Sequence, residues 1–214
     1  MLVTIWVYAM FWGVWFAPSD DPSALRRKRA TMLTSLVGLY LALALALVLR
    51  AVLPFRARPA HDLTFSFQAP YAPFGNTIDW SSMSFPSGHA AVFFALAVGL
   101  WTVSARLGIL GSLYALCAIC VPRIYIGRHF PTDIVAGALL GVVTVLLINE
   151  LLPRSALTPR VLAWSERHPT AFGALLFLSG LDIITNFSSI RGLLRIILSG
   201  HTDKLVMSAF ALLA

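Results

Sequence analysis

The chain has 214 residues, of which 58% are hydrophobic and only 12% are charged. Soluble domains carry roughly 25% charged residues, so this composition excludes an ordinary water-soluble domain. The net charge is +7, but the basic residues lie in short segments beside apolar runs, which is typical of membrane proteins rather than of nucleic-acid binding. We therefore expect an all-α fold, a single polytopic membrane domain over residues 1–214 with about six transmembrane helices.

Apolar runs predict where these six helices lie. In chain order they cover residues 2–17, 31–53, 89–104, 107–124, 132–152 and 171–187. The second run is the clearest, because at a rise of about 1.5 Å per residue it measures roughly 34 Å, which is enough to cross a bilayer. The tail at 188–214 alternates short apolar runs with basic residues. It predicts an in-plane amphipathic helix, and a broken seventh membrane segment is the alternative.

The positions of the basic residues predict the orientation of the helices. Basic residues at 26–29 and at 154–167 lie in predicted connecting loops beside apolar runs, so we expect these loops to be cytoplasmic. The long loop at 54–86 and the short turn near Arg128 then face outward.

Three groups of polar residues fall on this outer side. The first is RAVLPFRARP at 50–59, where the second helix ends, and the next is FPSGHAA at 85–91, where the third begins. The last is PRIYIGRHFPTD at 122–133, between the fourth and fifth helices. Ionisable residues near membrane depth are costly, so three such groups at one membrane face indicate a functional site.

The residue types in these groups suit a phosphate. Arg58 and Arg123 are permanent cations, and guanidinium groups bind phosphate oxygens in a bidentate way. Ser87, Gly88 and His89 stand at a helix start, where unpaired backbone amides and the helix dipole favour an anion. Together these residues predict a phosphate cradle without a Gly-rich nucleotide loop.

Two histidines and a carboxylate supply the predicted chemistry. His129 and Asp133 are four residues apart at a helix start and so share one face. The carboxylate can then hold the Nδ1–H group of His129, which leaves its Nε2 as a nucleophile or base. His89 can donate a proton to the leaving oxygen. This combination is suited to phosphoryl transfer.

A metal centre is the alternative interpretation of the same residues. His89, His129 and Asp133 are a possible set of two histidines and one carboxylate. The surrounding arginines disfavour it, because they would repel a divalent cation. We therefore expect no metal and no other cofactor.

The motif PSGH, followed by Arg123, five residues, His129, three residues and Asp133, resembles the type 2 phosphatidic acid phosphatase (PAP2) superfamily. The resemblance covers about residues 31–152 and implies a PAP2-like catalytic core there. It also implies a metal-independent, two-step reaction, in which His129 attacks phosphorus to form a phosphohistidine with the support of Asp133. His89 would protonate the departing lipid alcohol. The implied phosphate-binding residues are Arg58, Arg123, Ser87 and Gly88.

The chain departs from the family pattern at two positions. The first family element is a lysine, six residues and Arg-Pro; here Arg58 and Pro59 fit, but Ala51 occupies the lysine position. Arg50 or Arg56 is the candidate replacement for this lysine. The third element begins with Ser-Arg in the family, whereas here Pro122 precedes Arg123, so one hydrogen-bond donor is missing.

The resemblance further implies a phospholipid or isoprenoid phosphate substrate, such as undecaprenyl diphosphate, phosphatidate or lipid A. We expect it to be hydrolysed at the outer leaflet, with the protein in a bacterial cytoplasmic membrane. A phosphotransferase that uses a lipid or sugar acceptor is the alternative. A non-enzymatic membrane protein with a degenerate site is a further alternative. The sequence leaves the oligomeric state open, and membrane lipid is the only other partner we expect.

Overall fold

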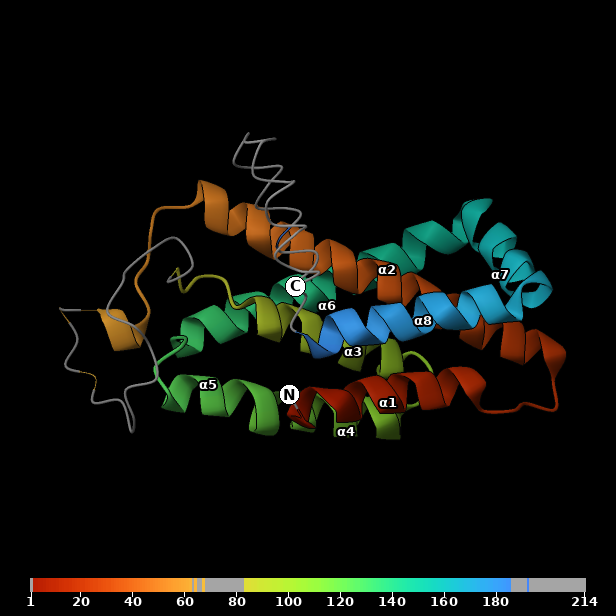
Figure 1. The fold of residues 1–214 in the computed structure, drawn as a ribbon, viewed down its shortest axis with the longest axis horizontal. Coiled ribbons are helices and arrows are strands. Elements are labelled where there is room, and N and C mark those ends of the chain that lie inside the picture. The colour runs from red at the N-terminus through yellow and green to blue at the C-terminus, as the bar shows by residue number, and fades with distance from the viewer. Residues whose placement is uncertain (1, 63, 65–66, 68–82, 186–191, 193–214) are drawn as a thin grey trace, which may run out of the picture. The chain divides into compact units, whose positions relative to one another are not determined.

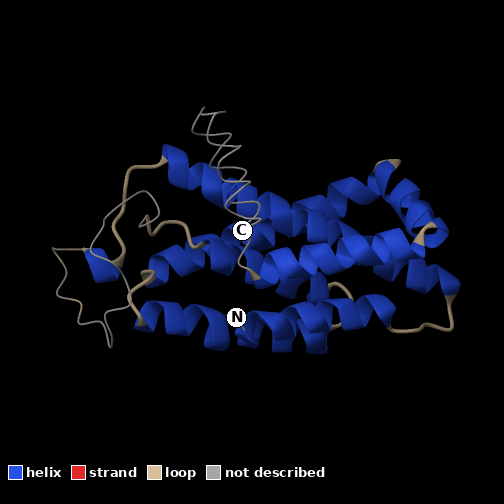
Figure 2. Cartoon of the chain, viewed as in Figure 1, coloured by secondary structure: helices blue, strands red, loops and turns tan. Residues whose placement is uncertain are grey.

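A computed structural model describes residues 2–62, 64, 67, 83–185 and 192 of the chain. Within these residues the regular structure is helical and contains no strand (Figure 2). This confirms the predicted all-α fold. The expected tail helix at 188–214 lies outside the described residues, apart from residue 192. The chain divides into two compact units, Trp6–Arg167 and the remainder at Met1–Ile5 and His168–Ala214.

Each of the six predicted segments is helical over most of its length. The helices are α1 (Leu2–Phe16), α2 (Pro22–Val52), η1 (Pro59–His61), α3 (Gly88–Trp101), α4 (Ala105–Tyr114), η3 (Ala115–Cys120), α5 (Val121–Tyr125), α6 (Pro131–Leu151), η4 (Leu152–Arg154), α7 (Leu157–Arg167) and α8 (Pro169–Ile184) (Figure 1). The π-helical turn η3 joins α4 to α5 in one helical run. Among the described helices, α2, the α4–α5 run and α6 are each long and apolar enough to cross a membrane.

Two basic segments that we predicted as connecting loops are helical instead. α2 begins at Pro22, because the Asp21 side chain accepts a hydrogen bond from the Ser23 amide at 2.8 Å and so caps the helix. α2 ends at Val52, since Pro54 disfavours helical geometry at the preceding residue. The second segment forms α7, a short amphipathic helix that buries Leu162 and exposes its arginines.

The core of the Trp6–Arg167 unit is the packing of α3 against α2 and α6. α3 is buried along most of its length, and the backbones of α3 and α6 almost touch. A Cβ atom on Gly137 would lie 2.2 Å from the Ser87 carbonyl oxygen, and one on Gly141 would lie 2.0 Å from the Ala91 carbonyl oxygen. Small residues permit such close helix pairs in membranes. These two glycines therefore fix the start of α3 against α6.

Replacing Gly141 by Ala is expected to destabilise the protein, although the same change normally stabilises a helix by about 1 kcal/mol. The added methyl group meets backbone rather than a flexible side chain, so α3 and α6 must separate, at a cost of about 1–3 kcal/mol. Gly13→Ala is the matched control, because nothing lies within 4 Å of its Cβ position. Thermal unfolding in one detergent measures both variants. Equal midpoints would contradict the close packing of α3 and α6.

Candidate active site

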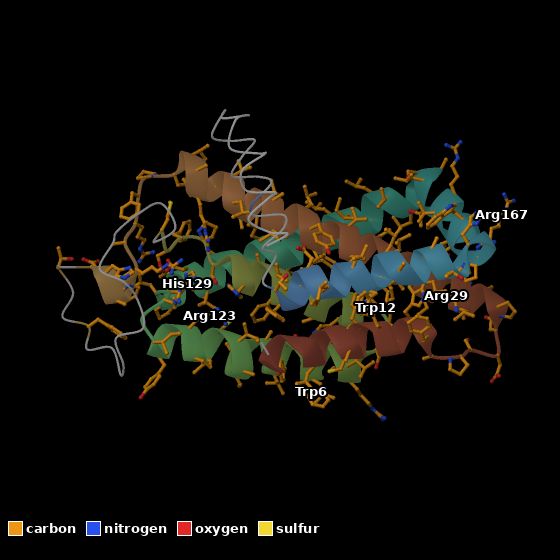
Figure 3. The ribbon with its side chains drawn as sticks, viewed as in Figure 1. Trp6, Trp12, Arg29, Arg123, His129 and Arg167 are labelled. Carbon is orange, nitrogen blue, oxygen red and sulfur yellow. The ribbon has the colours of Figure 1, made fainter. Side chains whose placement is uncertain are left out.

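The three polar groups predicted to meet do lie at one end of the Trp6–Arg167 unit. Figure 3 shows His129 and Arg123 there, and Arg29 and Arg167 at the opposite end. The Ser87 amide donates to the Asp133 carbonyl oxygen at 3.0 Å, which joins the starts of α3 and α6. Arg50, in the last turn of α2, reaches the same place by donating to the Pro86 carbonyl oxygen.

The turn between α5 and α6 delivers His129 to this end. Gly127 adopts a φ of 68°, the left-handed geometry that glycine tolerates best. Its amide donates to the Ile124 carbonyl oxygen at 3.0 Å, and the Arg128 amide donates to the Arg123 carbonyl oxygen at 2.8 Å. This pair of bonds is the Schellman motif that ends a helix. The chain therefore reverses at Gly127, and α6 starts only four residues later.

His129 is almost fully buried, with 4% of its surface exposed. Its Nδ1 lies 2.9 Å from the backbone carbonyl oxygen of Ser84. A carbonyl oxygen only accepts hydrogen bonds, so Nδ1 carries the proton and Nε2 keeps its lone pair. The predicted bond from Asp133 to Nδ1 is wrong, because the nearest carboxylate oxygen is 3.7 Å from Nδ1. The expected tautomer is nevertheless present, with a different partner.

Asp133 is fully buried and is held by other donors. Its Oδ1 accepts from Arg56 Nη1 at 2.7 Å. Its Oδ2 accepts from the Phe130 amide at 2.8 Å and from the Ser84 hydroxyl. Because Asp133 is the third residue of α6, its carboxylate turns back to the amide that precedes the helix, as in one half of a capping box. This local bond draws the carboxylate away from Nδ1 of His129.

The PSGH segment forms the start of α3, as predicted. Ser87 is the N-cap residue, and its Oγ accepts from the Ala90 amide at 3.3 Å. Its own amide is bound to Asp133, so we correct the expectation that this amide is available to an anion. Gly88 is the first residue of the helix, where an amide has no acceptor within the helix. His89 follows in the same turn and is half-buried.

The structure distinguishes the two arginines that are candidates for the missing lysine. Arg50 donates to the Pro86 carbonyl oxygen from Nε at 2.9 Å and from Nη2 at 2.7 Å. Its Nη2 lies 3.7 Å from the position that a Cβ of Gly88 would take. Arg56 instead pairs with Asp133, donates to the Thr132 hydroxyl at 3.1 Å and lies over the Phe130 ring. Of these two arginines, Arg50 is therefore the one that lies beside the start of α3.

The other two predicted arginines flank this arrangement. Arg58 directly precedes η1, where it is the N-cap residue. Arg123 lies in α5, and its Nη1 donates to the Ile119 carbonyl oxygen one turn earlier at 3.1 Å. In the described part of the chain, no three His, Cys, Asp or Glu side chains form a group that could hold a metal ion.

The electrostatic surroundings keep His129 neutral. Burial is the main cause that lowers its pKa below the ordinary value of 6.5, and the positive charges of Arg50 and Arg58 lower it further. Asp133 raises the pKa of His129, but by less than burial and the two arginines lower it. At neutral pH the imidazole therefore carries one proton, on Nδ1, and offers Nε2 as an electron-pair donor.

Sequence reasoning missed Ser84, which touches both His129 and Asp133. It precedes the PSGH tetrad by two residues in SFPSGH and is fully buried. The only signal in the sequence is a hydroxyl group in a segment that the fold buries. The essential contact of Ser84 is made by its backbone carbonyl, which no residue pattern reveals.

Comparisons with known proteins agree on one family. A family model described as the PAP2 superfamily matches residues 31–156. The chain is 33% identical over 84 residues to the bacitracin transport permease protein BcrC of Bacillus licheniformis, covering 39% of this chain and 41% of that protein. It is 42% identical over 59 residues to an undecaprenyl-diphosphatase of Sulfolobus acidocaldarius, covering 27% and 28% of the two chains.

A third relative is a decaprenylphosphoryl-5-phosphoribose phosphatase of Mycolicibacterium smegmatis, 32% identical over 111 residues. That match covers 51% of this chain and 54% of the relative. The chain thus spans about half or less of the length of the curated relatives it matches. No solved structure matches it at a comparable level.

Proposed function

Because this chain belongs to the PAP2 superfamily, we propose that it is a metal-independent membrane phosphatase that hydrolyses a lipid phosphate or diphosphate. The observation that supports this most is the state of His129. Its Nδ1–H group donates to the Ser84 carbonyl oxygen, so that Nε2 carries a lone pair at the end of the bundle that holds the PSGH turn. A neutral, oriented imidazole in this position is suited to attack phosphorus.

In the first proposed step, the lone pair on His129 Nε2 forms a bond to phosphorus. The bond between phosphorus and the bridging oxygen breaks, and its electron pair leaves with that oxygen. His89 donates a proton to the leaving oxygen, which departs as a lipid alcohol or, from a diphosphate, as a lipid monophosphate. The product of this step on the protein is a phosphohistidine at His129.

In the second step, water attacks the phosphohistidine. His89, which is now neutral, takes a proton from this water, and the P–N bond breaks with its electron pair returning to Nε2. Inorganic phosphate leaves and both histidines regain their first state. Charge on the phosphoryl oxygens is stabilised throughout by positive groups and donors that face it. We assign this role to Arg50, Arg58, Arg123, the Gly88 amide and the Ser87 hydroxyl proton.

An isoprenoid phosphate is the substrate class we favour. The names of two relatives contain isoprenoid phosphates: one is a phosphatase for undecaprenyl diphosphate and the other for a decaprenylphosphoryl sugar phosphate.

The basic segments at 26–29 and 154–167 favour an orientation with the site on the outer face, since these segments would lie in the cytoplasm. We propose a bacterial cytoplasmic membrane as the location.

A panel of phosphate-release assays tests the proposed function. Purified protein in detergent is given undecaprenyl diphosphate, undecaprenyl phosphate, phosphatidate, phosphatidylglycerol phosphate or lipid A, with excess EDTA throughout. We expect phosphate release from at least one lipid, at a rate that EDTA does not lower, and we expect an isoprenoid phosphate to be the preferred substrate. Adding a sugar or lipid acceptor separates hydrolysis from phosphotransfer. No release from any lipid, with or without acceptor, would refute the proposal.

The pH dependence of kcat/KM gives a second test. His129 must be neutral to attack, and its pKa lies below 6.5 because the residue is buried near Arg50 and Arg58. Activity is therefore expected to persist as pH falls through 6.5, and to decline only at lower pH as the imidazole takes up a proton. The profile is measured with two substrates whose phosphate groups have different pKa values. A limb that stays at the same pH for both substrates belongs to the enzyme. An enzyme limb centred above pH 6.5 would contradict this assignment.

A further inference from the structure

Ser84 lies between the carboxylate of Asp133 and the imidazole of His129. Its hydroxyl group donates to Asp133 Oδ2, and its carbonyl oxygen accepts from His129 Nδ1 at 2.9 Å. Its amide donates to the Arg56 carbonyl oxygen at 2.9 Å. All three polar groups of Ser84 are therefore bonded, one to the segment of Arg56 and two to the segment that holds His129 and Asp133.

These bonds close a ring through three segments of the chain. Arg56 binds Ser84 through its backbone and Asp133 through its guanidinium group at 2.7 Å. Ser84 and Asp133 are both fully buried, and His129 is nearly so. The Arg56 side chain is partly exposed, whereas the bonds among Ser84, Asp133 and His129 are buried. Buried hydrogen bonds favour one geometry, because breaking one leaves a polar group without a partner.

We propose that Ser84 is a positioning residue, through which Asp133 fixes the orientation and tautomer of His129. Asp133 holds the Ser84 hydroxyl, which fixes the peptide of Ser84, and the Ser84 carbonyl then holds the Nδ1 proton of His129. The carboxylate thus orients the nucleophile through one intervening residue rather than by a hydrogen bond of its own, since its Oδ2 lies 3.7 Å from Nδ1. This inference rests on the proposed function, because it concerns the same reaction.

The charges around His129 indicate how loss of the Ser84 hydroxyl should change the pKa of His129. Arg50 from α2 and Arg58 ahead of η1 disfavour a protonated imidazole, and Asp133 from α6 favours one. Asp133 Oδ2 now lies 3.7 Å from Nδ1. Without the Ser84 hydroxyl, this oxygen lacks one donor and is free to accept from Nδ1 directly. Direct contact with a carboxylate stabilises imidazolium and raises the pKa of His129.

Ser84→Ala is therefore expected to act in two ways that can be measured. The kcat for lipid phosphate hydrolysis should fall about 10- to 100-fold with KM nearly unchanged, a range typical of groups that orient a functional imidazole through its second nitrogen. The acid limb of kcat/KM should also move to higher pH, since less of the enzyme is neutral at a given pH. A merely structural serine would change neither limb nor kcat in this selective way.

Two controls keep the test decisive. Ser165→Ala removes a hydroxyl that donates within its own helix, and should leave both quantities unchanged. Ser84→Cys keeps the volume and a weak hydrogen-bond donor. If Ser84→Ala does not fold, the acid limb of kcat/KM in Ser84→Cys should still lie at higher pH than in the wild type. A wild-type kcat and limb in Ser84→Ala would overturn the inference alone. No phosphate release by the wild type on any lipid would instead overturn the proposed function.

A spectroscopic measurement on the unmodified protein does not depend on how the Ser84 variants fold. Nitrogen-15 NMR of histidine-labelled protein distinguishes the two neutral tautomers, and loss of one signal in His129→Asn assigns the resonance. We expect a neutral ring with the proton on Nδ1. A proton on Nε2 at neutral pH would overturn the inference, because the Ser84 carbonyl could not then be the partner of Nδ1.

Discussion

The His129→Asn protein should release phosphate from lipid substrates at least about 10⁴-fold more slowly than the wild type, as expected for loss of a covalent nucleophile. Asparagine is the informative replacement. Its amide nitrogen takes roughly the place of Nδ1, so it can still donate to the Ser84 carbonyl oxygen, which His129 approaches to 2.9 Å. The variant thus keeps the buried hydrogen bond and lacks only the nucleophilic Nε2.

His168→Asn is the matched control, since His168 is exposed and precedes α8. It should retain full activity. Thermal unfolding of both variants in the same detergent should give midpoints close to the wild type. Turnover within tenfold of the wild type in a folded His129→Asn protein would contradict the assignment of His129 as nucleophile.

His89→Asn should give the second largest effect, and the size of the loss should depend on the leaving group. A lipid alkoxide is a poor leaving group, so loss of the proton donor should slow its release by about 10²- to 10⁴-fold. A nitrophenolate needs no proton to depart. Its release from p-nitrophenyl phosphate in the first turnover, before water attacks the phosphohistidine, should therefore be slowed by less than about tenfold in the same variant.

The comparison between the two substrates carries the test of His89. Both share the attack by His129 and the same phosphoryl contacts, so a general loss of structure would slow both to the same extent. Equal losses in first-turnover release of the leaving group, from the lipid and from the aryl phosphate, would show that His89 does not act as the proton donor. The wild type and His129→Asn, assayed on both substrates, set the upper and lower limits.

The sequence predicted the helices well because apolar runs in a membrane protein must be helical if their backbone groups are to be bonded. Each predicted run is occupied by a helix or, at 107–124, by the joined α4–α5 run. The two errors lie in basic segments, where the apolar signal is weak. Asp21 followed by Pro22 is a typical helix start, which the prediction overlooked. The amphipathic pattern of α7 is typical of a surface helix, but the prediction assigned this segment to a loop.

The sequence predicted which polar segments the fold brings together, but not the contacts between them. The spacing placed His129 and Asp133 together at one helix start, where the structure has them, with Arg123 in α5, the preceding helix. It did not reveal that the Asp133 carboxylate caps its own helix, or that the Ser84 carbonyl holds Nδ1. Those contacts depend on a backbone group brought in by tertiary packing, which side-chain patterns do not encode.

Arg50 and Arg56 show the same limit. Arg50, which is adjacent to the lysine position, and Arg56 were both candidate replacements for the missing lysine. Their tertiary contacts distinguish them, because Arg50 donates to the Pro86 carbonyl oxygen and Arg56 to Asp133.

Trapping the phosphorylated protein tests the central claim most directly. Wild-type protein is mixed with a lipid substrate carrying ³²P in its terminal phosphate and quenched in alkali within the first turnover. We predict a label that survives alkali, is lost in acid, maps to His129 by mass spectrometry and is absent from His129→Asn. Phosphate release without any labelled intermediate, or with the label on another residue, would contradict the account.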